Sequence, residues 1–123
     1  MKVISTLTKK IFDSINADIP KDFDIVFPET LDPEGILNQC QDADFFIAVG
    51  SAFRLTETEL KRLTHLKLIS TLGVGYDHID VDACHRLSIP VANTRGTNAS
   101  SVAEHAIGGV IALQRRFIES DRA

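Results

Sequence analysis

The chain has 123 residues, of which 44% are hydrophobic and 24% are charged, and its formal net charge is −4. This length and composition suit one globular domain that can bury a core without metals or disulfides. The acidic balance argues against a nucleic-acid partner, and no apolar run reaches the roughly 18 residues that a membrane span needs, so neither partner is expected.

Short apolar runs alternate with amphipathic or polar stretches along most of the chain. Five runs are predicted to be strands: residues 3–7, 24–27, 45–49, 66–72 and 89–93. Four segments between them are predicted to be helices: residues 9–15, 33–40, 56–63 and 81–87. Three helix starts carry capping signals: Asp32 before a proline, Thr56 with Glu59 as a capping box, and Asp80.

The apolar runs are continuous rather than alternating, which is typical of parallel strands that are covered on both faces. Helices at βαβ spacing between such strands indicate an α/β fold. With right-handed crossovers, five strands fit a flavodoxin-like, doubly wound parallel sheet of order 2-1-3-4-5.

Residues 99–121 are predicted to form one long helix, with Ser101 and Glu104 as its capping box. About 22 residues at 1.5 Å each would extend roughly 33 Å, which is longer than the sheet of one domain needs. A wide apolar face follows along this helix: Val102, Ala103, Ala106, Ile107, Val110, Ile111 and Leu113. We therefore expect the helix to overshoot its own domain and to carry self-association into a homodimer.

The stretch TLGVGYDHID, residues 71–80, places two glycines directly after a predicted strand. A dinucleotide fingerprint would need a third glycine where His78 stands, and no acidic residue follows at residues 93–95, which argues against a Rossmann phosphate loop. At the carboxyl end of a parallel strand, the backbone amides of Val74 and Gly75 could instead bind a small carboxylate. A plain tight turn is the alternative.

Metal and thiol chemistry are not expected. His78 lies between Asp77 and Asp80, but a structural zinc site needs four nitrogen or sulfur ligands, and Cys84 and the histidine after it diverge on a short helix. Cys84 and Cys40 form no CxxC pair and are expected to be buried thiols. Buried free thiols fit a reducing compartment, and no signal peptide is recognisable at the N-terminus. The sequence therefore favours a cytoplasmic protein.

Three linked motifs resemble the NAD-dependent D-isomer-specific 2-hydroxyacid dehydrogenases, which include glyoxylate, D-lactate, D-phosphoglycerate and formate enzymes. The motifs are G-V-G-x-D-x-I-D at residues 73–80, I-P-V-x-N-T at 89–94 and N-x-x-S-V-A-E-H at 98–105. The match is close over residues 66–116, whereas residues 1–65 match only in pattern.

The resemblance implies a small 2-keto or 2-hydroxy acid as substrate and NAD or NADP as coenzyme. In this family the main-chain amides of the GVG loop hold the substrate carboxylate, the role that Val74 and Gly75 take here. Asn98 matches a loop asparagine that contacts substrate in the formate-oxidising members, and Val102 matches a residue near the nicotinamide. The implied site residues are Leu72, Gly73, Val74, Gly75 and Asn98 for substrate and Val102 for cofactor.

The resemblance also implies a division of the chain. Residues 1–98 would form the flavodoxin-like substrate domain, and residues 99–123 the interdomain and dimerisation helix. In the family, the NAD-binding Rossmann domain and the catalytic Arg, Glu and His follow this helix, so no catalytic residue is assigned here. In the full enzyme the Arg polarises the keto-acid carbonyl and the His protonates it as hydride arrives from NAD(P)H. The 123 residues alone are expected to be an inactive N-terminal part.

Two other functions are compatible with the same scaffold. A corepressor-like protein would bind NAD as a structural ligand and present a surface to a partner protein. A flavodoxin-like signalling receiver would need acidic residues after the first and third strands, where this chain has Ser5, Thr6 and the sequence Gly50-Ser51-Ala52. The receiver is therefore disfavoured.

Overall fold

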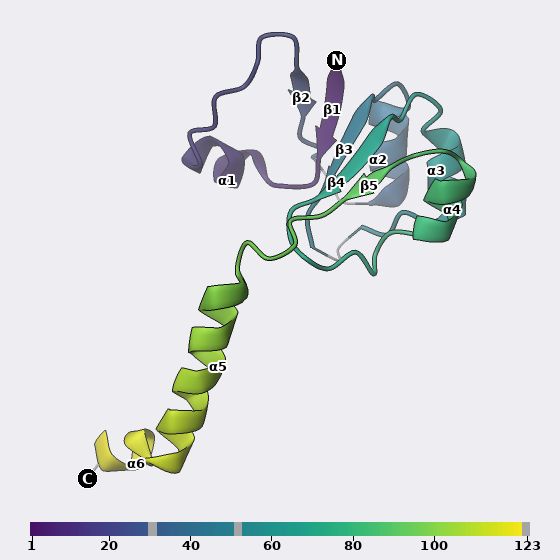
Figure 1. The fold of residues 1–123 in the computed structure, drawn as a ribbon. Coiled ribbons are helices and arrows are strands. Elements are labelled where there is room, and N and C mark those ends of the chain that lie inside the picture. Colours follow the sequence, from purple (N-terminus) through teal and green to yellow (C-terminus); the bar gives the residue numbers. More distant parts are fainter. Residues whose placement is uncertain (30–31, 51–52, 122–123) are drawn as a thin grey trace.

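The computed structural model describes residues 1–29, 32–50 and 53–121. It confirms the predicted sheet, with five parallel strands in the order β2-β1-β3-β4-β5 (Figure 1). The strands are β1 Lys2–Ser5, β2 Asp24–Val26, β3 Phe45–Ala48, β4 Leu68–Thr71 and β5 Val91–Ala92. Each is shorter than the apolar run that predicted it, because apolar residues just outside a strand also cover the core. Leu66 and Ile89, for example, are buried but precede β4 and β5.

Six helices connect or follow these strands in the described residues. They are α1 Lys9–Ser14, α2 Pro33–Cys40, α3 Glu57–Arg62, α4 Val81–Arg86, α5 Ala99–Gln114 and α6 Phe117–Asp121. The predicted caps are present: the carboxylate of Asp32 accepts the Gly35 N–H at 3.0 Å, and that of Asp80 accepts the Ala83 N–H at 2.9 Å. The Glu59 carboxylate likewise accepts the backbone N–H of Thr56 at 2.8 Å.

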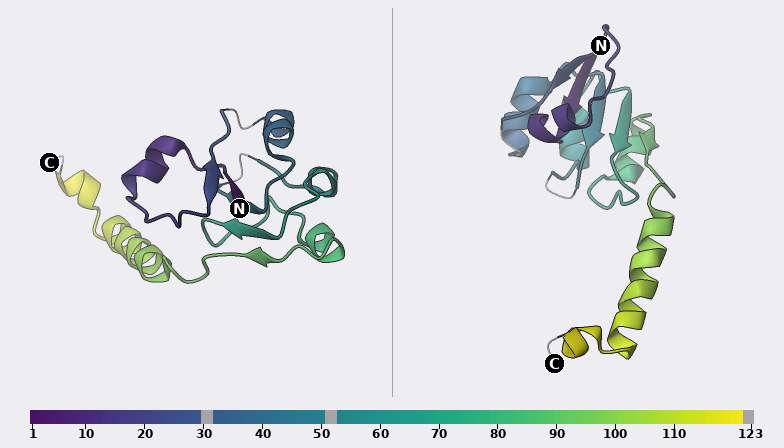
Figure 2. Two further views of the ribbon diagram at one scale, coloured as in Figure 1. Left: turned by 90° about the horizontal axis from the view of Figure 1, so that it is seen from above. Right: turned by 90° about the vertical axis from the view of Figure 1, so that its left-hand side faces the viewer.

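The core lies between the sheet and the layer formed by α2, α3 and α4, which share one side of the sheet (Figure 2). Ile4, Phe46 and Ile69, from the three central strands, are fully enclosed. Phe46 stacks on Phe53 with ring centroids 5.6 Å apart. Burial of these apolar side chains is the main favourable term in folding the body, by which we mean residues 1–98.

The opposite side of the sheet carries only α1 among the described helices (Figures 1 and 2). Beside α1 the sheet is hollowed by an apolar cavity of about 550 Å³, whose lining includes Phe12, Phe23, Phe45 and Leu68. A flavodoxin-like sheet would cover this face with its last helix as well. Here α5 leaves the sheet instead of packing back onto it.

The long helix predicted for residues 99–121 is interrupted. Arg115 ends α5, and Arg116 has φ +51°, in the left-handed region, before α6 begins. The predicted capping box at Ser101 is wrong as well. Because α5 already starts at Ala99, with Asn98 at the N-cap and no side-chain cap, Ser101 lies inside the helix, where its hydroxyl cannot cap the first turn.

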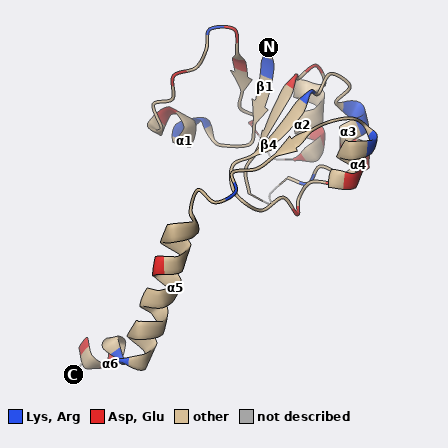
Figure 3. Cartoon of the chain, in the orientation of Figure 1, with Lys and Arg blue, Asp and Glu red and all other residues tan. Residues whose placement is uncertain are grey.

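The arm, residues 99–121, projects away from the body (Figure 1). No residue of α5 is buried, and Ile107 and Leu113 are 61% and 78% exposed. Charged side chains are spread over the body but are nearly absent from α5 (Figure 3). The apolar face is thus open along its whole length in the single chain, so the expected homodimer stays a prediction.

Some expectations concern residues outside the described part of the chain. These are Ser51 and Ala52 after the third strand and residues 122–123 at the end of the expected interdomain helix. Within the described ranges, no helix is both long and apolar enough to cross a membrane.

Candidate functional site

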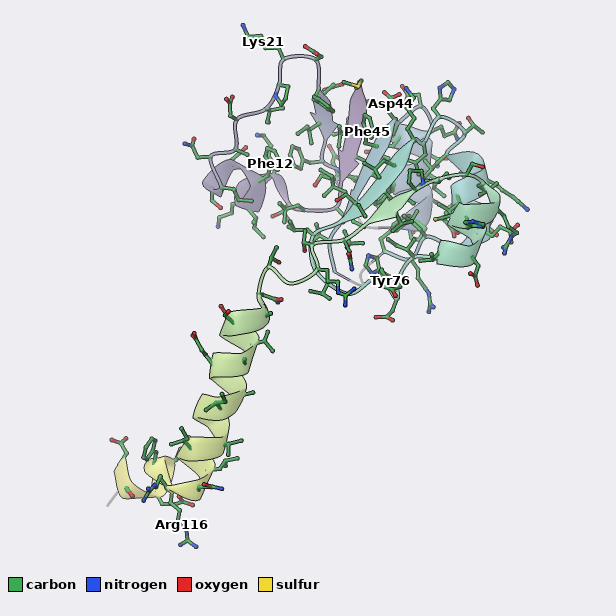
Figure 4. The ribbon with its side chains drawn as sticks, in the orientation of Figure 1. Phe12, Lys21, Asp44, Phe45, Tyr76 and Arg116 are labelled. Atoms are coloured by element: carbon green, nitrogen blue, oxygen red, sulfur yellow. The ribbon has the colours of Figure 1, made fainter. Side chains whose placement is uncertain are left out.

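The glycine loop, residues 72–76, follows β4 at the end of the sheet from which the arm departs. Tyr76 marks this end in Figure 4, and Asp44 marks the opposite end, at the start of β3. The carboxyl ends of parallel strands are where open α/β sheets bind ligands. The glycine loop therefore occupies the ligand end of the sheet.

Two carbonyl groups of the glycine loop accept hydrogen bonds from the residues that follow β5. The Gly73 carbonyl accepts hydrogen bonds from the Thr94 N–H and from the Thr71 hydroxyl, both at 3.0 Å. The Val74 carbonyl accepts one from the side-chain amide of Asn93 at 2.9 Å. Since Asn93 and Thr94 directly follow β5, both carbonyls point toward that strand.

The amides of the same two peptide groups have no acceptor among the described residues. In a trans peptide the N–H points opposite the C=O, and the described residues contain no cis peptide bond. The N–H groups of Val74 and Gly75 therefore face away from β5. Neither donates a hydrogen bond to any acceptor in residues 1–29, 32–50 or 53–121. The result is two adjacent donors, on two exposed residues, at the ligand end of the sheet.

The two glycines of the loop serve different purposes. Gly73 has φ +148°, a conformation that residues with a side chain rarely adopt. The φ of Gly75 lies outside the range of roughly +20° to +160° that favours glycine. A Cβ added at Gly75 would meet the Asp77 Oδ2 at 3.7 Å, which is an ordinary contact distance. Gly73 is thus required by the backbone, whereas Gly75 mainly leaves room for something to approach.

The glycine loop borders a half-open hollow of about 250 Å³, which we call the loop hollow. It lies between the carboxyl ends of β3 and β4. Its lining residues are Ala48, Gly50, Thr71, Leu72, Gly73, Gly75, Asp77 and His78. This volume is below the usual range of pockets for drug-sized ligands and suits a ligand of a few heavy atoms.

The structure brings the predicted residues of the loop together and leaves two others apart. Leu72, Gly73 and Gly75 line the loop hollow, whereas Val74, which is 43% exposed, is not among its lining residues. Asn98 is exposed just before α5, and its side chain bonds to none of the described residues. Val102 is 58% exposed on α5. Neither lines the loop hollow.

Sequence reasoning missed the residues that orient the loop. The sequence places Asn93 and Thr94 in the motif at residues 89–94 and Thr71 in the predicted strand 66–72, but it assigns none of them a role in the loop. In the structure these three residues hold the loop carbonyls. A signal was present, because polar residues directly after an apolar run stand at the ligand end of a parallel sheet.

No group of three or more His, Cys, Asp or Glu side chains in the described ranges could hold a metal ion. Cys84 is buried in the core, and this burial, followed by the charge of Asp80, raises the pKa of its thiol. A thiol with a raised pKa stays protonated at neutral pH, whereas metal binding requires the thiolate. Cys84 therefore fits a structural role.

An open parallel sheet in the order β2-β1-β3-β4-β5 with connecting helices defines an α/β domain of the doubly wound class. The family described as "D-isomer specific 2-hydroxyacid dehydrogenase, catalytic domain" matches residues 2–120, and the chain belongs to this family.

Named relatives and solved structures agree with this assignment. The chain is 35% identical to an (S)-sulfolactate dehydrogenase of Chromohalobacter salexigens, over 80% of this chain and 32% of the relative. It is 31% identical to a glyoxylate reductase of Thermofilum pendens, over 80% and 30%. A 3-phosphoglycerate dehydrogenase of Entamoeba histolytica with bound NAD+ superposes with a TM-score of 0.73 at 29% identity, over 91% of this chain and 38% of that structure. The chain spans about a third of the length of these proteins.

Proposed function

We propose that this chain is the substrate-binding part of an oxidoreductase that transfers hydride between NAD(P)H and a small 2-keto or 2-hydroxy acid. The N–H groups of Val74 and Gly75 bind the substrate carboxylate. One observation carries the proposal. These two amides have no acceptor among the described residues, while the carbonyls of the same peptide groups are hydrogen-bonded to Asn93 and Thr94 after β5.

The chemistry of the loop suits a carboxylate. Hydrogen bonds from N–H groups to an ionised acceptor are shorter and roughly twice as strong as bonds between neutral groups. Two adjacent donors held by a fastened loop fix the carboxylate in one place. The carbonyl carbon next to it is then fixed as well, and orientation of this kind supplies much of the rate in such reactions. Positioning is thus the contribution that the body makes to catalysis.

The coenzyme would be bound mainly by residues other than these. No G-x-G-x-x-G sequence occurs in the chain, so the pyrophosphate of NAD(P) has no fingerprint site here. Val102 is apolar and exposed, which fits contact with a nicotinamide ring, and the exposed Asn98 could reach substrate from the start of α5. When bound, the coenzyme supplies the hydride. We propose that the 123 residues alone bind the acid without turning it over.

A second copy of the chain is the proposed protein partner. The apolar face of α5 is exposed in the single chain, and Gly108 and Gly109 have nothing within 4 Å of an added Cβ. Two interior glycines weaken a helix by roughly 1 kcal/mol each relative to alanine. They also permit close approach of another backbone, which supports a helix-to-helix homodimer through residues 99–121.

The carboxylate site can be tested by titrating the ¹⁵N-labelled chain with glyoxylate and following backbone amide shifts by NMR. We expect saturable shifts centred on Val74 and Gly75. Glycolaldehyde, which keeps the two-carbon frame but lacks a carboxylate, is the matched ligand control and should leave these amides unchanged. Glyoxylate shifts that map elsewhere, or equal shifts with glycolaldehyde, would remove the loop from the substrate site.

A further inference from the structure

The side chain of His78 is buried and has no hydrogen-bond partner among the described residues. Only 9% of the residue is exposed, and the Nε2 atom is fully enclosed. Neither ring nitrogen bonds to any atom in the part of the chain that the structure describes. His78 lines the loop hollow together with Gly73 and Gly75.

The position of His78 is fixed by its backbone rather than by its ring. Its carbonyl accepts the Leu55 N–H at 2.9 Å, and the next residue, Ile79, forms a parallel bridge with Leu55. These bonds hold the segment after the glycine loop against the segment before α3. His78 is therefore kept at the hollow by its backbone, since its side chain bonds to none of the described residues.

A buried imidazole without partners needs an explanation. Every protonation state of the ring carries at least one N–H donor, and most buried side-chain polar atoms in proteins are hydrogen-bonded. The enclosed Nε2 has no room for a ligand atom, so a small ligand in the loop hollow would accept the N–H of the other ring nitrogen, Nδ1. A carboxylate is well suited, because its two oxygens offer about four lone-pair sites and the two loop amides use only part of them.

We propose that the imidazole of His78 donates a hydrogen bond to the carboxylate of the acid in the loop hollow, as a third donor beside the amides of Val74 and Gly75. The inference rests on the function proposed above. Asp77, which is exposed and also lines the hollow, places a negative charge near the bound anion. A further donor on the buried side offsets that repulsion. His78 thus acts as a binding residue for the substrate carboxylate.

The test compares dissociation constants for glyoxylate, measured from the Val74 and Gly75 amide shifts of the whole chain. His78→Phe keeps a buried ring and removes both nitrogens, and we expect it to weaken binding roughly tenfold, as loss of one charge-assisted hydrogen bond would. His78→Asn retains a side-chain N–H and should recover most of the affinity. His65→Phe, at an exposed histidine after α3, is the matched control and should bind like the unchanged chain.

A second measurement is independent of folding defects in the variants. In the unchanged chain, the ring ¹⁵N shifts of His78 should move with the same glyoxylate dependence as the Val74 amide. Equal affinity in His78→Phe, or ring shifts that do not respond while the loop amides do, would overturn the role of His78 and leave the carboxylate site standing. Absence of any glyoxylate response at Val74 and Gly75 would overturn both.

Discussion

The body and the arm both contain helices with an apolar face, but that face is buried in the body and exposed in the arm. In the body, α2 buries Ile36, Leu37 and Cys40 against the sheet. In the arm, α5 is twice as long and more apolar, yet it buries no residue at all. An apolar stripe on a helix therefore predicts that this face will be buried, but it does not identify the surface that buries it. The body holds the fold and the candidate site, whereas the apolar face of the arm is uncovered in the single chain.

The largest difference between the two regions should be in stability. Phe46→Ala removes a fully enclosed ring that stacks on Phe53, and we expect it to lower the free energy of unfolding by about 3–5 kcal/mol. Leu113→Ala, at a side chain that is 78% exposed, should change it by less than about 0.5 kcal/mol in the monomer. Urea denaturation at low protein concentration measures both. Similar losses would mean that the arm packs onto the body.

The next largest effect concerns assembly. Ile107 and Ile111 stand four residues apart on one face of α5 and are 61% and 47% exposed. Burying an isoleucine contributes roughly 1.5–3 kcal/mol, so Ile107→Glu combined with Ile111→Glu should raise the dimer dissociation constant by about 100-fold or more. Sedimentation equilibrium should show a dimer for the unchanged chain and a monomer for this double variant.

A control on another helix sharpens this prediction. Ile11 on α1 is 50% exposed but lies outside the arm, and Ile11→Glu should leave the dimer intact. If the unchanged chain is a monomer at micromolar concentration, or if Ile11→Glu separates the chains as well, the arm is not the association surface.

The two loop glycines should respond differently to alanine. Gly73→Ala forces a side chain into the φ of +148° and should destabilise the body by about 1–3 kcal/mol. Gly75→Ala meets only ordinary contacts and should cost less than about 0.5 kcal/mol. Thermal unfolding of the two variants decides this, and a greater loss for Gly75→Ala would contradict the loop geometry.

The smallest expected change in unfolding free energy concerns two predicted helix caps, Asp80 in the body and Ser101 in the arm. Asp80→Ala removes the acceptor for the Ala83 N–H in the body and should cost about 1 kcal/mol. Ser101→Ala, inside α5 of the arm, should be neutral or slightly stabilising, because alanine has the highest helix propensity. A loss for Ser101→Ala equal to that for Asp80→Ala would restore Ser101 as a helix cap.

Local signals predicted much of the fold. The strand order follows from the spacing of apolar runs, and α2 begins and ends as expected because Asp32, Pro33 and the apolar stripe all lie within the segment. The break at Arg116 had no such signal, since neither glycine nor proline stands there. For the site, the sequence indicated Val74 and Gly75. It could not indicate that Asn93 and Thr94 hold the loop carbonyls and so turn the amides of Val74 and Gly75 away from β5. Those contacts form only when β5 lies beside β4.

The most direct test of this division of roles is a glyoxylate titration of the Ile107→Glu and Ile111→Glu double variant, followed by amide NMR. If the body alone builds the carboxylate site, the monomeric variant will show the same Val74 and Gly75 shifts and the same affinity as the unchanged chain. Loss of those shifts in a variant whose body remains folded would show that the arm, or the second copy it binds, is part of the site.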